Sequence, residues 1–157
     1  MSKGINPSYG INEMKILEFI VAGNSYGLNI FDVKEILPYS KPASLPNSHP
    51  CIEGFFIPRD FLITVINLAK CLELPENPIT GEDRLILIGK DDQNIAFHVD
   101  SVAGIHNIAN TDIMEPDEAI TTSLKEAVTG VLNTGNKQIE ILDIDVINNY
   151  INSSLAI

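Results

Sequence analysis

Alternating apolar and polar residues predict a protein built mainly of short β-strands. The run 15–21 (KILEFIV) supplies apolar residues to both faces of a strand, and the turn at 22–25 lets 26–30 pair back on it as a hairpin. The run 61–68 is rich in branched side chains, which fit a pleated surface better than a helix. Further strands are expected at 84–89, 95–102, near Ile105 and Ile108, and at 128–132 and 138–142 around a second hairpin turn.

Two short helical segments are expected between these strands. Asp32 is placed to cap a single turn over 32–37, because its carboxylate accepts from free backbone N–H groups and Pro38 cannot continue a helix. Asn67 is expected to cap a helix over 68–74 in the same way. The polar stretch 111–126 is expected to be loop-like.

The chain is expected to form one domain. Residues 1–12 are turn-rich and predict a flexible leader, 13–157 form the domain, and the loop 75–82 is the best candidate for a seam between two halves. Residues 143–155 are expected to close the chain as a helix held by packing, with four residues facing inward: Ile144, Ile147, Ile151 and Leu155. Short strands with helical plugs are typical of small barrels, which leave no free sheet edge.

The composition agrees with a folded domain and argues against some classes of binding partner. Of 157 residues, 45% are hydrophobic and 20% are charged, as expected of a globular chain. The net charge is −11, from 10 basic and 21 acidic residues without a basic cluster, which argues against nucleic acid and against anionic membranes. No apolar run approaches the roughly 20 residues of a spanning helix, and no signal peptide is present, so a soluble cytoplasmic protein is expected. Cys51 and Cys71 are interpreted as reduced thiols.

The sequence offers no catalytic constellation. His49, His98 and His106 lack metal-ligand spacing, and His98 is interpreted as a sheet-surface histidine or one satisfied by a partner. No phosphate loop and no nucleophile elbow occur, so neither cofactor nor metal is expected. Acidic groups such as Asp143 and Asp145 have no evident pocket or cation and are interpreted as solvated. The rival hypothesis, an acidic-site hydrolase on a small barrel, would need a carboxylate pair clustered in a pocket.

An ordered series of short motifs resembles the CheW-like domain of bacterial chemotaxis coupling proteins. The motifs run from about residue 10 to residue 150, and they are YGLNI at 26–30, VKEI at 33–36, LP at 45–46, EG at 53–54, Arg59, ITVINL at 63–68 and FHVDSV at 97–102. The opening 10–19 (GINEMKILEF) resembles the start of CheV proteins, whose N-terminal domain is of this type. The resemblance implies two intertwined five-stranded, SH3-like barrels with short helical plugs and a C-terminal helix.

The resemblance also implies which residues meet a partner. Val33 and Glu35 fall on the family's receptor-facing motif, with Gly54 and Arg59 beside them, and in the family the glutamate and arginine at these places are paired. This chain departs from the family at Asp60, where the family has glycine, so that a second carboxylate adjoins Arg59 and is counted with the receptor-binding residues. Asparagine also replaces the family's aspartate at position 67, which keeps the capping ability.

The function implied is that of a non-catalytic adaptor. Such a protein docks to the regulatory domain of the histidine kinase CheA and to the cytoplasmic tips of chemoreceptors, without inserting into the membrane. The alternative within the same fold is the regulatory CheW-like domain of a CheA-type kinase. The resemblance carries no kinase-facing residue over to this chain.

Overall fold

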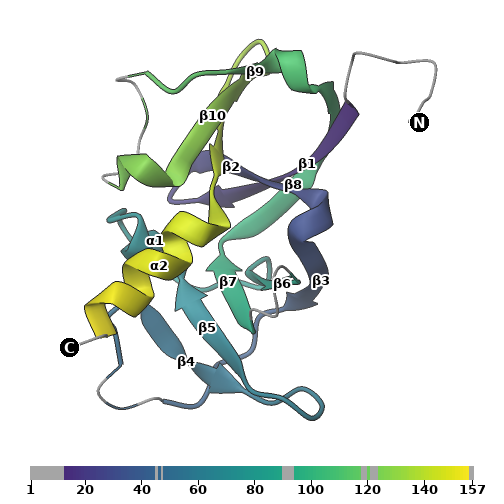
Figure 1. The fold of residues 1–157 in the computed structure, drawn as a ribbon. Coiled ribbons are helices and arrows are strands. Elements are labelled where there is room, and N and C mark those ends of the chain that lie inside the picture. The colour runs from purple at the N-terminus through teal and green to yellow at the C-terminus, as the bar shows by residue number, and fades with distance from the viewer. Residues whose placement is uncertain are drawn as a thin grey trace.

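Two β-sheets make up the computed structural model of this protein (Figure 1). The structure describes residues 13–44, 46, 48–89, 94–117, 120 and 124–155, so the expected leader 1–12 lies outside the described residues. The six-stranded sheet has the order β8-β1-β2-β11-β10-β9, with β1 at Glu13–Val21, β2 at Asn24–Asn29, β8 at Ser101–Ala109, β9 at Ile113–Met114, β10 at Val128–Asn133 and β11 at Gln138–Leu142. The five-stranded sheet has the order β3-β6-β7-β5-β4, with β3 at Val33–Pro38, β4 at Ile52–Phe56, β5 at Ile63–Asn67, β6 at Arg84–Ile88 and β7 at Ile95–Val99.

The chain enters the six-stranded sheet, leaves it, and returns. It crosses to the five-stranded sheet at the 3₁₀ helix η1 (Ile30–Asp32) and comes back at Asp100, between β7 and β8. Asp100 fixes the return, because its N–H donates to the carbonyl of Ile20 at 2.9 Å and its carboxylate accepts from the N–H of Ala22 at 2.9 Å. Residues 75–82 join the helix α1 (Leu68–Cys71) to β6, within the path of the five-stranded sheet.

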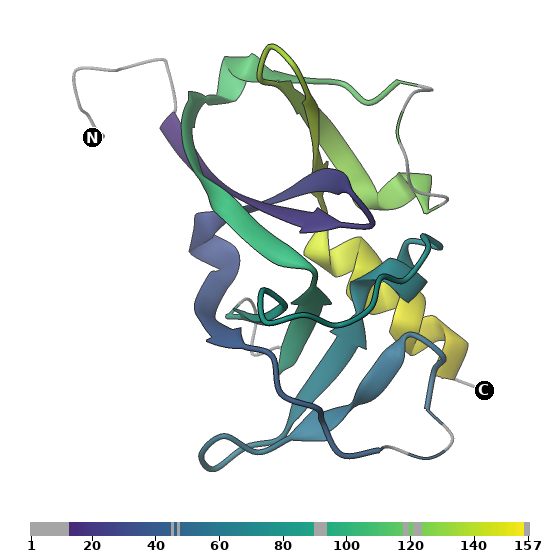
Figure 2. The same ribbon diagram turned by 180° about the vertical axis from the view of Figure 1, so that it is seen from behind.

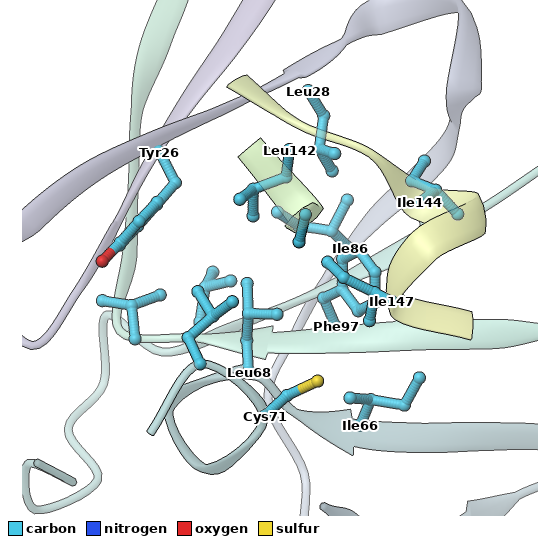
Figure 3. Close-up of a cluster of buried hydrophobic side chains, with 14 of the residues drawn as sticks. Tyr26, Leu28, Ile66, Leu68, Cys71, Ile86, Phe97, Leu142, Ile144 and Ile147 are labelled. Atoms are coloured by element: carbon cyan, nitrogen blue, oxygen red, sulfur yellow. The ribbon is translucent and has the colours of Figure 1, made fainter. Parts of the chain in front are cut away.

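The largest hydrophobic cluster lies between the two sheets (Figure 3). Strands β1 and β6 each serve two clusters, because successive side chains point to opposite faces. On β1, Leu17 belongs to the central cluster and Ile16 to a cluster within the six-stranded sheet. On β6, Ile86 belongs to the central cluster and Leu85 to one within the five-stranded sheet. The sheets are therefore held together by the strands that also build each barrel.

The C-terminal helix α2 (Ile144–Leu155) packs against this central cluster. Figures 1 and 2 show it running from the six-stranded sheet along the five-stranded sheet. Three of the four expected inward residues, Ile144, Ile147 and Ile151, are buried there, and the side chain of Leu155 lies outside the described residues. The predicted fold class is confirmed: mainly β, with two barrel-like sheets, short helices and a C-terminal helix. The six-stranded sheet exceeds the expected five strands because the two-residue strand β9 joins its edge.

The expected helical turn over 32–37 is wrong. The turn comes earlier, over η1, and its cap is Asn29, whose side chain accepts from the N–H of Phe31 at 3.0 Å. Val33–Pro38 is the strand β3, in which half-buried and exposed residues alternate with the period of two that a strand requires. Pro38 is tolerated because it is the last residue of β3 and because β3 stands at the end of the sheet order.

Three other boundaries differ from the sequence prediction. The expected strand 95–102 is divided at Asp100, and its second part continues past Ile105 and Ile108 as the nine-residue β8. The helix capped by Asn67 ends at Cys71 rather than at residue 74, although the cap itself is confirmed: the Asn67 side chain accepts from the N–H of Lys70 at 3.0 Å. The stretch 111–126 contains the strand β9 and most of two 3₁₀ turns, η2 (Asn110–Asp112) and η3 (Lys125–Ala127).

Candidate functional site

Glu35 and Arg59 meet on the surface of the five-stranded sheet. Glu35 lies on β3, and Arg59 lies in the turn between β4 and β5. Arg59 Nη1 is 3.7 Å from Glu35 Oε1, with the two side chains 61% and 36% exposed. An ion pair this exposed adds little to stability, since solvent screens it. The pair therefore holds two charged groups near each other at a solvent-accessible surface.

A second contact joins the same two segments. Lys34 Nζ lies 4.9 Å from the centroid of the Phe61 ring, a cation–π geometry that again connects β3 to the β4–β5 turn. Apolar side chains accompany these charges, with Ile57 58%, Leu62 43% and Ile36 38% exposed. The β3 and β4–β5 turn segments therefore expose apolar side chains as well as the charged pair.

The structure sorts the five expected receptor-binding residues by exposure. Glu35, Arg59 and Asp60 are accessible at their surface, with Asp60 exposed in the same turn as Arg59. Val33 begins β3 half-buried and packs against the central cluster. Gly54 is buried within β4, where an added Cβ would lie 2.0 Å from the carbonyl oxygen of Ala43. Gly54 thus allows a close backbone approach inside the barrel.

The sequence analysis did not identify the other residues of β3 and the β4–β5 turn that lie near Glu35 and Arg59. Lys34, Ile36, Ile57, Phe61 and Leu62 join the surface only because β3 and the β4–β5 turn come together, although they are about 25 residues apart in the chain. The period-two pattern of VKEILP was the one available signal, since it places Lys34 and Ile36 on the outward face of β3.

The polar groups considered for catalysis have structural roles. The carboxylate of Asp143 accepts from the N–H groups of Asp145 and Val146 at 2.9 and 3.3 Å, which caps α2. His98 is buried with a carboxylate against each ring nitrogen, so the interpretation of a satisfied histidine is confirmed. Among the residues that the structure describes, no group of three His, Cys, Asp or Glu side chains is placed to hold a metal ion. Neither described helix has the length and apolar character needed to cross a lipid bilayer.

Comparison with known proteins identifies the family. A model of the CheW-like domain matches residues 15–150, which is most of the chain. The chain belongs to the CheW-like domain family. It is 28% identical over 133 residues to the chemotaxis protein CheW of Bacillus subtilis, covering 85% of each chain. It is 27% identical over 148 residues to the chemotaxis protein CheV3 of Helicobacter pylori, covering 87% of this chain and 48% of that protein.

A solved structure gives the same assignment. The fold superposes on the crystal structure of the scaffolding protein TtCheW from Thermoanaerobacter tengcongensis with a TM-score of 0.78 and 28% sequence identity. The match covers 85% of this chain and 90% of that one. The resemblance to CheW and CheV proteins inferred from the sequence is therefore confirmed.

Proposed function

We propose that this protein is a non-catalytic scaffold that couples chemoreceptors to the histidine kinase CheA in the cytoplasm. The family and the relatives named CheW support a role as a chemotaxis coupling adaptor. Relatives named CheW and CheV3 favour an adaptor over the regulatory domain of a kinase. The carboxylates Glu53 and Asp83 do lie near each other, as an acidic-site hydrolase would require. Both contact His98, however, and Glu53 also accepts from the Tyr39 hydroxyl, so these oxygens are engaged within the five-stranded sheet even though Glu53 also lines a cavity.

The observation that carries the receptor assignment is the convergence of β3 and the β4–β5 turn at Glu35 and Arg59. Two segments distant in sequence expose a paired carboxylate and guanidinium amid apolar side chains. A protein partner presenting its own charged and apolar groups gains orientation from the charges and affinity from the apolar contacts. We assign the chemoreceptor tip to this surface, with Val33 and Gly54 supporting it from beneath. The kinase takes a different face, because a coupling protein must hold both partners at once.

Charge reversal at the pair tests this assignment. Arg59→Glu places a carboxylate beside Glu35 and Asp60, and we expect it to weaken binding of the isolated cytoplasmic receptor tip at least tenfold, about 1.4 kcal/mol. Binding of the isolated kinase regulatory domain should stay within about 1 kcal/mol of wild type. Calorimetric titration against each partner measures both values. Lys125→Glu, on the exposed η3 of the other sheet, is the matched control and should alter receptor binding by less than the reversal at Arg59.

The proposal fails in two distinguishable ways. Equal loss of both affinities in Arg59→Glu, with circular dichroism unchanged, would contradict separate faces. Failure of the wild-type protein to bind either partner, and to bring both into one complex on size-exclusion chromatography, would contradict the coupling function itself. Val33 is a poorer probe because its side chain packs on the central cluster, so a charge there also tests the fold.

A further inference from the structure

The five-stranded sheet contains a buried histidine held between two carboxylates. His98 on β7 contacts Asp83, which precedes β6, through Nε2 and Oδ2 at 2.6 Å. Its other ring nitrogen, Nδ1, contacts Oε1 of Glu53 on β4. The ring of Tyr39, just beyond β3, stacks on the imidazole with centroids 4.0 Å apart and planes 19° apart. Three other segments of the sheet therefore contact this one side chain of β7.

The hydrogen-bond partners fix where the protons are. The second oxygen of Glu53 accepts from the Tyr39 hydroxyl at 2.7 Å. The second oxygen of Asp83 accepts from the backbone N–H of Thr80 at 2.9 Å. One oxygen of each carboxylate thus accepts from another donor, and the other oxygen faces a ring nitrogen of His98. With both carboxylates ionised, each ring nitrogen of His98 must donate, and only the imidazolium carries a proton on both.

We propose that His98 is a buried imidazolium, protonated at neutral pH, whose charge closes the five-stranded barrel by binding Glu53 and Asp83. The side chains of His98 and Asp83 are 9% and 3% exposed, and two ionised carboxylates facing each other at that depth without a cation would repel strongly. The imidazolium replaces that repulsion with two charge-assisted hydrogen bonds. A neutral histidine could satisfy only one of the two carboxylates.

Other charged groups surround the network. A cavity of about 360 Å³ beside it is lined by Glu53 and His98 together with Lys70 of α1, Glu76 of the following loop and Asp100 after β7. The guanidinium of Arg84 on β6 donates to the carbonyl oxygens of Gly81 and Asp83 at 2.9 Å. The cavity lets the buried proton exchange with solvent.

The balance of burial and hydrogen bonding agrees with a charged ring. Burial acts to lower the pKa of His98, but the hydrogen bonds to Glu53 and Asp83 outweigh it and raise the pKa above 6.5. Burial likewise acts to raise the pKa of Glu53, but the hydrogen bonds from His98 and Tyr39 outweigh it and lower the pKa below 4.5. The stabilisation from His98 is complete below about pH 6.5 and is lost as the pH rises through its folded pKa.

Nitrogen NMR of the wild-type protein tests directly whether both ring nitrogens of His98 are protonated. At pH 7.5 we expect both ring nitrogens of His98 to show the chemical shift of a protonated nitrogen, each coupled to its own hydrogen. A ring with one unprotonated nitrogen at that pH would overturn the proposal, because the shared proton would then lie on a carboxylate. This measurement needs no substitution and does not depend on whether a variant folds.

Urea unfolding across pH 6 to 9 tests the energetic consequence. Between about pH 6.5 and the folded pKa, the unfolding equilibrium constant should rise by up to tenfold per pH unit, because unfolding releases the His98 proton. His98→Gln should lack this component. Tyr39→Phe keeps His98 and both of its carboxylates and should retain it. The same pH dependence in His98→Gln as in wild type would overturn the proposal.

Discussion

Gly54 shows how a close approach of the backbone can require one residue type. Its φ is +158°, and a Cβ there would meet the carbonyl oxygen of Ala43 at 2.0 Å. We expect Gly54→Ala to lower the free energy of unfolding by about 2 kcal/mol or more, because the β4 bulge must open to admit a methyl group. Gly81→Ala is the control, since nothing lies within 4 Å of its added Cβ, and it should be neutral or stabilising by up to about 1 kcal/mol. Urea denaturation measures both, and equal effects would refute the steric account.

Glu35 and Arg59 are expected to matter more for binding than for stability. Because both side chains are substantially exposed, a double-mutant cycle of Glu35→Ala and Arg59→Ala should give a coupling below about 1 kcal/mol in urea unfolding. In receptor-tip binding, the double variant should lose less affinity than the sum of the single variants, because each single change leaves one charge without its partner. Strict additivity in the binding titration would mean that the two residues act separately. Loss of a cooperative unfolding transition would make the pair structural instead.

At the scale of elements, Glu18 ties the strands of the six-stranded sheet. It lies on β1 opposite Gly27 of β2 and Gly104 of β8. Its buried carboxylate contacts Ser25 Oγ at 2.7 Å, His106 Nε2 at 2.7 Å and Lys137 Nζ at 2.6 Å, which brings the β10–β11 hairpin onto β1. Like Glu53, this carboxylate is held by hydrogen bonds within a sheet.

This cluster predicts an acid-sensitive contribution to stability. Burial acts to raise the pKa of Glu18, but hydrogen bonds from Lys137, His106 and Ser25 outweigh it and lower the pKa. The contribution is therefore present above about pH 4.5 and is lost as the pH falls through the folded pKa. The difference in unfolding free energy between wild type and Glu18→Gln should shrink over that range, and a constant difference would contradict the ionised cluster.

Lys137→Met should lower the free energy of unfolding at pH 7 by about 1–2 kcal/mol. The effect is no larger because the Lys137 side chain is 44% exposed and solvent screens its charge. Lys125→Met is the control and should lower the free energy of unfolding by less.

The elements predicted well from the sequence are those whose secondary structure is set by their own local apolar pattern. The strands at 84–88 and 138–142 have strong apolar patterns and were located within one residue. The strand β3 was mistaken for a helical turn because Asp32 and Pro38 supply helix-like boundaries, while its strand character depends on pairing with β6. The break at Asp100 was equally hidden, since it depends on hydrogen bonds to Ile20 and Ala22 about 80 residues away.

The candidate site, too, was predictable only where the sequence itself carried a signal, and not where contacts depend on the folded chain. The resemblance to a family supplied Glu35 and Arg59, and the structure places them within reach of each other. Nothing in the sequence pattern near Lys34 indicated that Phe61 would lie under its ammonium group, because that contact needs the folded β4–β5 turn. The network around His98 was missed for the same reason: Glu53 and Asp83 are 45 and 15 residues from it in the chain.

At the scale of the whole molecule, the two sheets should unfold as one unit. The central cluster draws residues from both sheets and from α2, and strands such as β1 and β6 supply this cluster with one face and their own barrel with the other. A barrel that lost the central cluster would expose one full face of these strands to water. The energetic cost of that exposure links the two halves.

Ile147 offers the sharpest test of this cooperativity. Its side chain is 0% exposed and lies in the central cluster, with Phe97 and Ile86 beside it in Figure 3. Ile147→Ala should lower the free energy of unfolding by about 2–5 kcal/mol through lost burial and the cavity left behind. Ile79→Ala, at a position 58% exposed, should change it by less than about 0.5 kcal/mol. Hydrogen exchange of peptides from β10–β11 and from β5–β7 should accelerate by the same factor in Ile147→Ala, because both sheets open together. Acceleration confined to one sheet, or two separate transitions in urea, would show that the barrels are independent and that α2 stabilises only one of them.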